Sequence, residues 1–219
     1  MKKLLVIILF FPLLGVAQSS TAFWEIGVYT GGLNYSGDIN KEGDIGTWIN
    51  EMKPEFGLVL KRNFNYRVNM GVEAGWGTLY AADKNHNLPE RDYVMSTDIV
   101  QANVVFEINF KKFGKYFKRN QNTPFVKTGM GILFFTPELN DNAEYPIDQY
   151  ELYWGTYSTY NFQVAFGWKW RISYHSFLSL DMHYNSTGAS YLEGFNLKDS
   201  PNPNDSYYGL RLTYSYGIF

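Results

Sequence analysis

One stretch decides the fold of this 219-residue chain: Asn161-Phe162-Gln163-Val164-Ala165-Phe166-Gly167-Trp168-Lys169-Trp170. Its even positions hold bulky apolar side chains, and its odd positions hold small or polar ones. Because successive side chains of a β-strand point to opposite faces, this alternation predicts a strand with one apolar face and one polar face. A tilted strand of about 9 to 11 residues is long enough to cross a bilayer.

The same alternation recurs in eight segments, and we find no convincing helix-period stretch from residue 23 onward. Within the cores of these segments, apolar side chains hold 37 of 42 even positions but only 6 of 34 odd positions. Eleven glycines lie at odd positions and only Gly32 lies at an even one, so the odd face is the crowded one. We predict strands near residues 23–34, 54–62, 67–80, 98–110, 123–134, 160–170, 176–186 and 207–219.

Two eight-stranded barrels compete for this pattern: a lipocalin-like soluble barrel that is apolar inside, and an outer-membrane barrel that is apolar outside. An eight-stranded barrel is only wide enough inside for side chains, so the rings of Phe162, Phe166, Trp168 and Trp170 could not all point inward with similar sets from seven other strands. We therefore predict an all-β protein, an eight-stranded antiparallel transmembrane β-barrel with a filled polar lumen that passes no solutes. Its lumen charge network would comprise Glu25, Glu55, Lys61, Glu73, Glu107, Lys127, Lys169, Asp181, His183 and Arg211.

The predicted connections alternate between long and short. Membrane barrels place long loops outside and short turns in the periplasm, so this order puts both termini on the periplasmic side. Aromatic residues gather at the predicted strand ends, as in the girdles of such barrels. The last residue, Phe219, falls on the inward parity, which the alternation does not explain beyond fraying of the strand end.

Composition excludes several classes of protein. The chain has 19 Lys and Arg against 21 Asp and Glu, and this lack of basic excess disfavours a nucleic-acid partner. It has no Cys, which excludes disulfides and Cys-based zinc sites. A mean hydropathy of -0.28 argues against a helical membrane bundle.

The first seventeen residues differ from the rest of the chain. Lys2 and Lys3 precede a short apolar run that contains Pro12, and small residues lead to Ala17. This pattern is typical of a signal peptide cleaved near Ala17/Gln18. We expect residues 1–17 to be the signal peptide and residues 18–219 to be the barrel domain of the outer membrane.

Histidine chemistry is limited to three residues, His86, His175 and His183, of which only His183 is expected in the lumen. It lies two residues after Asp181, with Ser186 and Ser190 beyond, and a lipid hydrolase could use such a set. The same pair is equally an ordinary part of a lumen network, so we assign no catalytic, cofactor or metal site. The acidic loop residues lack EF-hand spacing and are interpreted as solvated rather than calcium-binding: Asp38, Glu42, Asp44, Asp199 and Asp205.

The predicted periplasmic turn at residues 111–119 is unusually basic. It also carries Phe113, Tyr116 and Phe117. Such a turn could be a docking surface for a periplasmic partner or for anionic head groups. Alternatively, it is a positively charged rim that anchors the barrel. The candidate partner-docking residues, which we call the basic turn cations, are Lys111, Lys112, Lys115, Lys118 and Arg119.

The stretch Trp24-Glu25-Ile26-Gly27-Val28-Tyr29-Thr30-Gly31-Gly32-Leu33-Asn34-Tyr35-Ser36-Gly37-Asp38-Ile39 resembles the opening of PorG-type barrels of the Bacteroidetes type IX secretion system. In those barrels a Glu-x-Gly strand runs into a Gly-rich segment that ends in Tyr-x-Gly-Asp. The similarity in length, strand count and loop order covers the chain after residue 17, but only this stretch is motif-like. The resemblance implies a non-enzymatic outer-membrane component that holds a periplasmic ring of the PorK lipoprotein and PorN.

Two other functions remain open on the sequence. A lipid-modifying barrel enzyme would use His183. An adhesion or structural barrel would bind through its long outer loops, and residues 135–159 have a suitable aromatic composition, although this loop could equally fold over the barrel mouth. Its aromatic residues are Tyr145, Tyr150, Tyr153, Trp154 and Tyr157.

Overall fold

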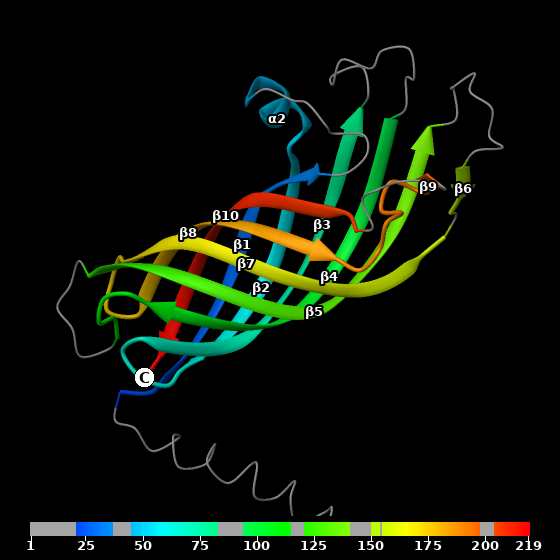
Figure 1. Ribbon diagram of the computed structural model, residues 1–219. Helices are drawn as coiled ribbons and strands as arrows, with labels where there is room; N and C mark the ends of the chain where they lie inside the picture. Colours follow the sequence, from blue (N-terminus) through cyan, green and yellow to red (C-terminus); the bar gives the residue numbers. More distant parts are fainter. Residues whose placement is uncertain are drawn as a thin grey trace, which may run out of the picture.

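The computed structural model describes residues 21–36, 45–82, 94–114, 121–140, 150–153, 155–197 and 204–219. Eight strands close into an antiparallel barrel, which confirms the predicted fold (Figure 1). The predicted signal peptide and its cleavage site lie outside the described residues. The barrel strands are β1 (Phe23–Ser36), β2 (Lys53–Asn63), β3 (Val68–Ala82), β4 (Val94–Asn109), β5 (Asn122–Asn140), β7 (Tyr157–Arg171), β8 (Ser176–Thr187) and β10 (Ser206–Ile218).

Strands that follow one another around the barrel are neighbours in the chain, and β1 closes the sheet by pairing with β10. That seam runs from Trp24 opposite Ile218 to Ser36 opposite Ser206, so it is paired over nearly all of both strands. Closure leaves no strand edge of the barrel without a partner. We call the end where β1 begins and β10 ends the short-turn end, and the opposite end the long-loop end.

The two faces of the sheet follow the predicted parity. Along β7, burial alternates residue by residue, with Gln163 fully buried and Phe166 57% exposed. The apolar even positions therefore point outward and the glycine-rich odd positions point inward. A lipocalin-like barrel with an apolar interior is excluded, because the large rings lie on the outer surface.

The structure adds elements that the alternation did not predict. A short helix, α2 (Ile45–Glu51), lies where we found no helix-period stretch, because two turns are too short to show a helical period. A separate two-stranded sheet pairs β6 (Tyr150–Leu152) with β9 (Phe195–Leu197) at the long-loop end (Figure 1). Among the described residues, no helix is long and apolar enough to cross a bilayer.

Helix α2 is seated on the rim of the barrel by contacts to β1 and β10. The ring of Trp48 stacks on Tyr208, with centroids 6.2 Å apart, and Asn34 Nδ2 donates to the Trp48 carbonyl at 3.0 Å. The side chain of Met52 fills the space where a Cβ of Gly32 would stand. Gly32, the only glycine of the outward face in the predicted pattern, is therefore a contact point for the segment after α2.

Candidate functional site

The lumen near the short-turn end holds a compact cluster of four charges. The carboxylate of Glu107 lies 2.7 Å from Lys61 Nζ through one oxygen and 2.7 Å from Lys169 Nζ through the other. The two ammonium groups also face Glu25, at 3.6 and 3.5 Å. Ser215 Oγ donates to Glu25 at 2.7 Å. Two cations and two anions thus neutralise one another inside the barrel, as buried charges require.

A second cluster lies closer to the middle of the barrel. Arg211 Nε donates to Glu55 at 2.6 Å, and its Nη1 donates to Glu73 at 2.9 Å. Lys127 Nζ lies 2.9 Å from Glu73 and 3.7 Å from Asp181. Here three carboxylates share two cations. The structure places every residue of the expected lumen charge network on the inward face.

His183 belongs to this second cluster and is 1% exposed. Its Nδ1 lies 3.7 Å from Asp181 and its Nε2 lies 3.8 Å from Glu55. Ser186 does not share the lumen face, because it has the outward parity of β8, opposite Phe162 of β7. Ser186 is therefore not brought onto one face with His183 and Asp181.

Of the other two histidines, the structure describes one. His86 lies outside the described residues. His175 lies at the short-turn end, where its ring stacks on Phe219 with centroids 5.0 Å apart. In the part of the chain that the structure describes, no group of three or more His, Cys, Asp or Glu residues could hold a metal ion.

An uncharged layer covers the second cluster on the side of the long-loop end. Asn161 Nδ2 lies 3.2 Å from Gln101 Oε1, 3.2 Å from Asn103 Oδ1 and 3.3 Å from Asn185 Oδ1. Tyr207 donates its hydroxyl to Gln101 at 3.0 Å. All of these side chains are buried inside the barrel.

Beyond this layer, toward the long-loop end, the interior also holds a cluster of buried apolar side chains. Ala189 and Leu192, from the connection after β8, are buried in one cluster with side chains from β1, β3, β4 and β5. This cluster, which we call the long-loop plug, explains why some inward positions of the pattern are apolar. Its members include Leu33, Tyr35, Leu79, Ala81, Met95, Ile99, Leu133, Phe135 and Tyr207.

Hydrogen bonds hold the plug in place. Tyr35 donates its hydroxyl to Asp205 at 2.9 Å and also bonds to Glu193. The second oxygen of Asp205 accepts the backbone N–H of Leu192 at 2.9 Å. The expectation that Asp205 is a solvated loop residue was wrong, because it is buried and holds a loop inside the barrel mouth. The acidic residues at 38, 42, 44 and 199 lie outside the described residues.

The described part of the aromatic-rich loop at residues 135–159 lies over the long-loop plug. Tyr153 stacks on Tyr191 with centroids 4.3 Å apart, and Tyr157 meets both rings edge to face. Phe135 of the plug contacts Tyr157 and Tyr191. The described part of this loop thus folds over the barrel mouth. Tyr145 and Trp154 lie outside the described residues, as does the side chain of Tyr150.

A second plug closes the short-turn end. The buried rings of Phe23, Phe113 and Phe177 form one cluster. Phe219 joins it, with its centroid 4.9 Å from that of Phe23. Because β10 ends at Ile218, Phe219 lies beyond the strand, where its ring contacts that of Phe23 while 37% of the residue stays exposed. Arg171 closes the same mouth by donating from Nη1 to the Gly114 carbonyl at 2.7 Å.

The basic turn begins inside this plug. Lys111 and Lys112 are exposed, whereas Phe113 is 1% exposed and its N–H donates to the Tyr66 carbonyl at 2.9 Å. The interpretation of Phe113 as part of a docking surface was therefore wrong. Lys115, Tyr116, Phe117, Lys118 and Arg119 lie outside the described residues.

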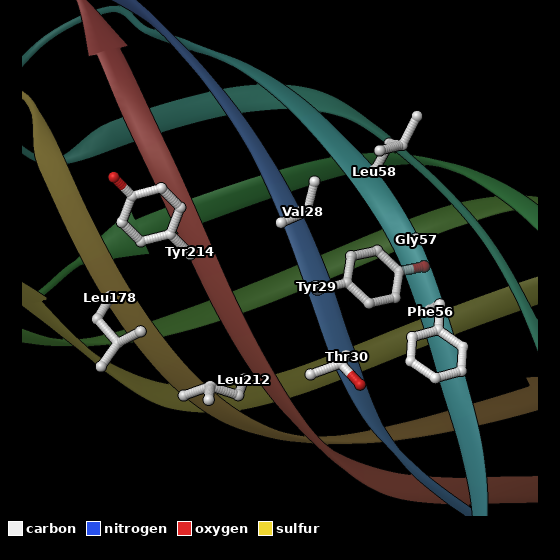
Figure 2. A pocket seen from close by; sticks show the side chains of 9 residues that line it. All are labelled: Val28, Tyr29, Thr30, Phe56, Gly57, Leu58, Leu178, Leu212 and Tyr214. Carbon is white, nitrogen blue, oxygen red and sulfur yellow. The ribbon is translucent and has the colours of Figure 1, made fainter.

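The outer surface of the barrel carries shallow apolar grooves. Figure 2 shows one of them, which crosses β2, β1, β10 and β8. Bulky outward side chains line it. Tyr29 and Gly57 also line it, at positions where no large side chain points outward. Its lining is almost entirely apolar, which fits contact with hydrocarbon rather than with a polar ligand. The outward lining residues are Val28, Thr30, Phe56, Leu58, Leu178, Leu212 and Tyr214.

Comparison with known proteins supports the same class of barrel. A family model described as a domain of unknown function, DUF6089, matches residues 2–217. The chain belongs to the DUF6089 family. No curated protein matches it significantly.

Solved structures of outer-membrane barrels resemble this DUF6089 protein at low sequence identity. Neisserial surface protein A aligns with a TM-score of 0.52 at 10% identity, over 89% of this chain and 97% of that chain. The β-barrel domain of Pseudomonas aeruginosa OprF aligns at 0.46 and 10%, over 89% and 97%. OprG of the same organism aligns at 0.47 and 10%, over 91% and 97%. The first of these likenesses shows the fold.

Proposed function

We propose that this DUF6089 protein spans the outer membrane, after signal-peptide cleavage near Ala17/Gln18, with its short-turn end in the periplasm. The support is the belt of exposed apolar side chains around the barrel, such as Leu58 at 64% and Met130 at 67% exposure. A soluble monomer seldom exposes so large a continuous apolar surface. The alternation of long and short connections is that of membrane barrels with periplasmic turns.

We further propose that the barrel is a non-enzymatic component of a type IX secretion machine that anchors or docks a periplasmic lipoprotein ring of the PorK and PorN type. The described residues bury apolar clusters toward both ends of the barrel, with the charge clusters between them, and this filling supports a role other than passing solutes. We therefore expect the barrel to function through the surfaces at its two ends. The PorG-like stretch from Trp24 to Ile39 directs the proposal to the secretion machine.

The observation that carries the docking proposal is the anchorage of the basic turn. Phe113 is packed in the short-turn plug, and Lys111 N–H donates to Thr123 Oγ1 at 3.0 Å. On the other side, Gln121 Nε2 donates to the Lys112 carbonyl at 3.2 Å. A charged turn that starts from fixed points loses less conformational entropy when a partner binds.

Charge reversal tests this proposal. Replacing all five basic turn cations (Lys111, Lys112, Lys115, Lys118 and Arg119) with Glu should leave a folded barrel that no longer retains the ring in a pull-down from solubilised outer membranes. A matched control reverses Lys84, Arg91 and Lys198, which lie in long connections. Ring retention by the five-fold variant would refute the docking site. Recovery of the wild-type barrel alone, under conditions that preserve the ring, would refute the secretion role.

Two alternatives have their own tests. A lipid-modifying enzyme would show activity on purified lipid that depends on His183, and activity that persists in His183→Ala would remove that residue. An adhesion or structural barrel would bind through its long loops, and the cluster of Tyr153, Tyr157 and Tyr191 gives those loops an ordered aromatic surface. Binding to host protein or glycan that is lost when Tyr153 and Tyr191 become Ala would favour it.

A further inference from the structure

Charge is segregated along the barrel axis. The connections at the short-turn end, residues 64–67, 110–121 and 172–175, contain six Lys and Arg and no Asp or Glu. The connections at the long-loop end, residues 37–52, 83–93, 141–156 and 188–205, contain four Lys and Arg against 14 Asp and Glu. The short-turn end therefore presents positive charge without compensating carboxylates in its turns.

Two cations at this end lie on the side wall of the barrel rather than on its tip. Arg62 of β2 stands over the indole of Trp24 on β1, with Cζ 5.2 Å from the ring centroid. Lys111 stands over the indole of Trp168 on β7, with Nζ 5.7 Å from the ring centroid. Both indoles are exposed, at 44% and 37%. In the described part of the chain, neither cation forms an ion pair with a carboxylate.

The two pairs lie on opposite sides of the barrel. Around the closed sheet, two strands separate β1 from β7 on one side, and two separate β2 from β5 on the other. The pair of Arg62 and Trp24 lies at the seam of β1 and β2. Lys111, which follows β4 and bonds to Thr123 of β5, reaches across β5 to Trp168 of β7. Contacts at two opposite points fix both the depth and the tilt of a barrel in a bilayer.

We propose that these two cation–indole pairs bind the phosphates of anionic phospholipids in the leaflet at the short-turn end. Indole rings favour the boundary between hydrocarbon and headgroups, and Arg and Lys donate hydrogen bonds to phosphate oxygens. The indole holds each side chain along the wall, so its charged end lies at headgroup level. A protein partner fits this arrangement less well, because the two pairs face away from each other and a single surface could contact both only by surrounding the barrel. The proposal rests on the membrane placement above and goes beyond the docking of a ring, since Arg62 is not one of the basic turn cations.

Lipid selectivity in nanodiscs tests the proposal. The full barrel is reconstituted with equal amounts of phosphatidylglycerol and phosphatidylcholine of the same acyl chains, and retained lipids are counted by native mass spectrometry. Attraction of an anionic lipid by one cation is worth about a fivefold preference. We expect the wild type to enrich phosphatidylglycerol several-fold, and the double variant Arg62→Gln/Lys111→Gln to return to the bulk ratio.

The chain provides a matched control at the other end. Lys53 stands over the ring of Tyr80 on the outer wall, with Nζ 4.4 Å from the centroid. Lys53→Gln removes the same kind of pair from the long-loop end and should leave the phosphatidylglycerol preference unchanged. An equal loss in the control, or a wild type at the bulk ratio, would overturn the proposal. So would a double variant that loses a ring partner but keeps its lipid preference, since that result would assign the cations to protein contact. A failed membrane placement would appear differently, as a barrel that does not insert.

Discussion

The side chain of Tyr29 lies across Gly75, so this tyrosine fits only because residue 75 has no side chain. A Cβ added to Gly75 would overlap the Tyr29 hydroxyl, and a Cβ added to Gly57 would overlap its Cζ. Figure 2 shows the ring reaching from β1 toward Gly57 of β2. The guanidinium of Arg211 packs on the same ring, 4.1 Å from its centroid. The tyrosine thus links three strands to the charge network of the lumen.

This packing predicts that Tyr29→Phe rescues one of two glycine variants and not the other. Gly75→Ala and Gly57→Ala should each destabilise the barrel by about 1–3 kcal/mol through overpacking. Tyr29→Phe removes the hydroxyl that Gly75→Ala would meet, and in the described residues this hydroxyl has no hydrogen-bond partner. Tyr29→Phe should therefore cost little and should rescue Gly75→Ala but not Gly57→Ala. Unfolding midpoints in urea check this, and equal rescue of both variants would contradict it.

Neutralising Glu107 should strongly destabilise the barrel. Glu107→Gln leaves the ammonium groups of Lys61 and Lys169 with Glu25 as the one remaining carboxylate of their cluster, and breaking such a buried pair costs about 3–5 kcal/mol. Adding Lys61→Met restores neutrality, so the double variant should be more stable than Glu107→Gln alone. Equilibrium unfolding followed by tryptophan fluorescence measures both. Simple addition of the two losses would show that charge balance does not govern this cluster.

Removing the carboxylate of Asp205 should release the long-loop plug without unfolding the barrel. Asp205→Ala deletes one of the two acceptors of the Tyr35 hydroxyl and the acceptor of the Leu192 N–H. We expect the Leu192 amide to exchange with solvent deuterium about five- to thirtyfold faster, since this is the factor that a lost hydrogen bond of about 1–2 kcal/mol corresponds to. Asp98→Ala is the control, because Asp98 bonds Thr78 on the outer face. Unchanged protection of Leu192 would show that apolar packing alone holds the plug.

Phe113→Ala should weaken binding of the periplasmic ring of the PorK and PorN type, although the substitution changes no charge. The ring of Phe113 packs edge to face on Phe177, with centroids 5.4 Å apart, and its removal frees the start of the basic turn. Truncating a buried Phe costs about 3–5 kcal/mol, so the variant must first be shown to fold. Phe110→Ala removes an exposed aromatic ring three residues earlier in the chain and serves as the control. If both variants recovered the periplasmic ring equally well, docking would not depend on the anchorage of the basic turn by Phe113.

The strands could be predicted because each carries its own signal. In β7 the contrast between Phe166 and Gln163 is local, and it sets the strand and its faces without any knowledge of its neighbours. The signal fades at the long-loop end, where the outward positions Asp98 and Thr136 are polar. There the fourth predicted strand begins too late and the fifth stops too early: β4 starts already at Val94, and β5 runs on to Asn140.

The sequence alone therefore determined that eight alternating strands close into a barrel with its glycines and charges inside, because an eight-stranded interior has no room for the large rings. Only the tertiary structure decided which charges pair: Arg211 bonds to Glu55 across 156 residues of chain, and no local pattern encodes such a distance. The same holds for the two plugs. Leu192 and Phe113 lie in connections without periodicity, and each enters the lumen because it buries apolar surface there that its own segment cannot cover.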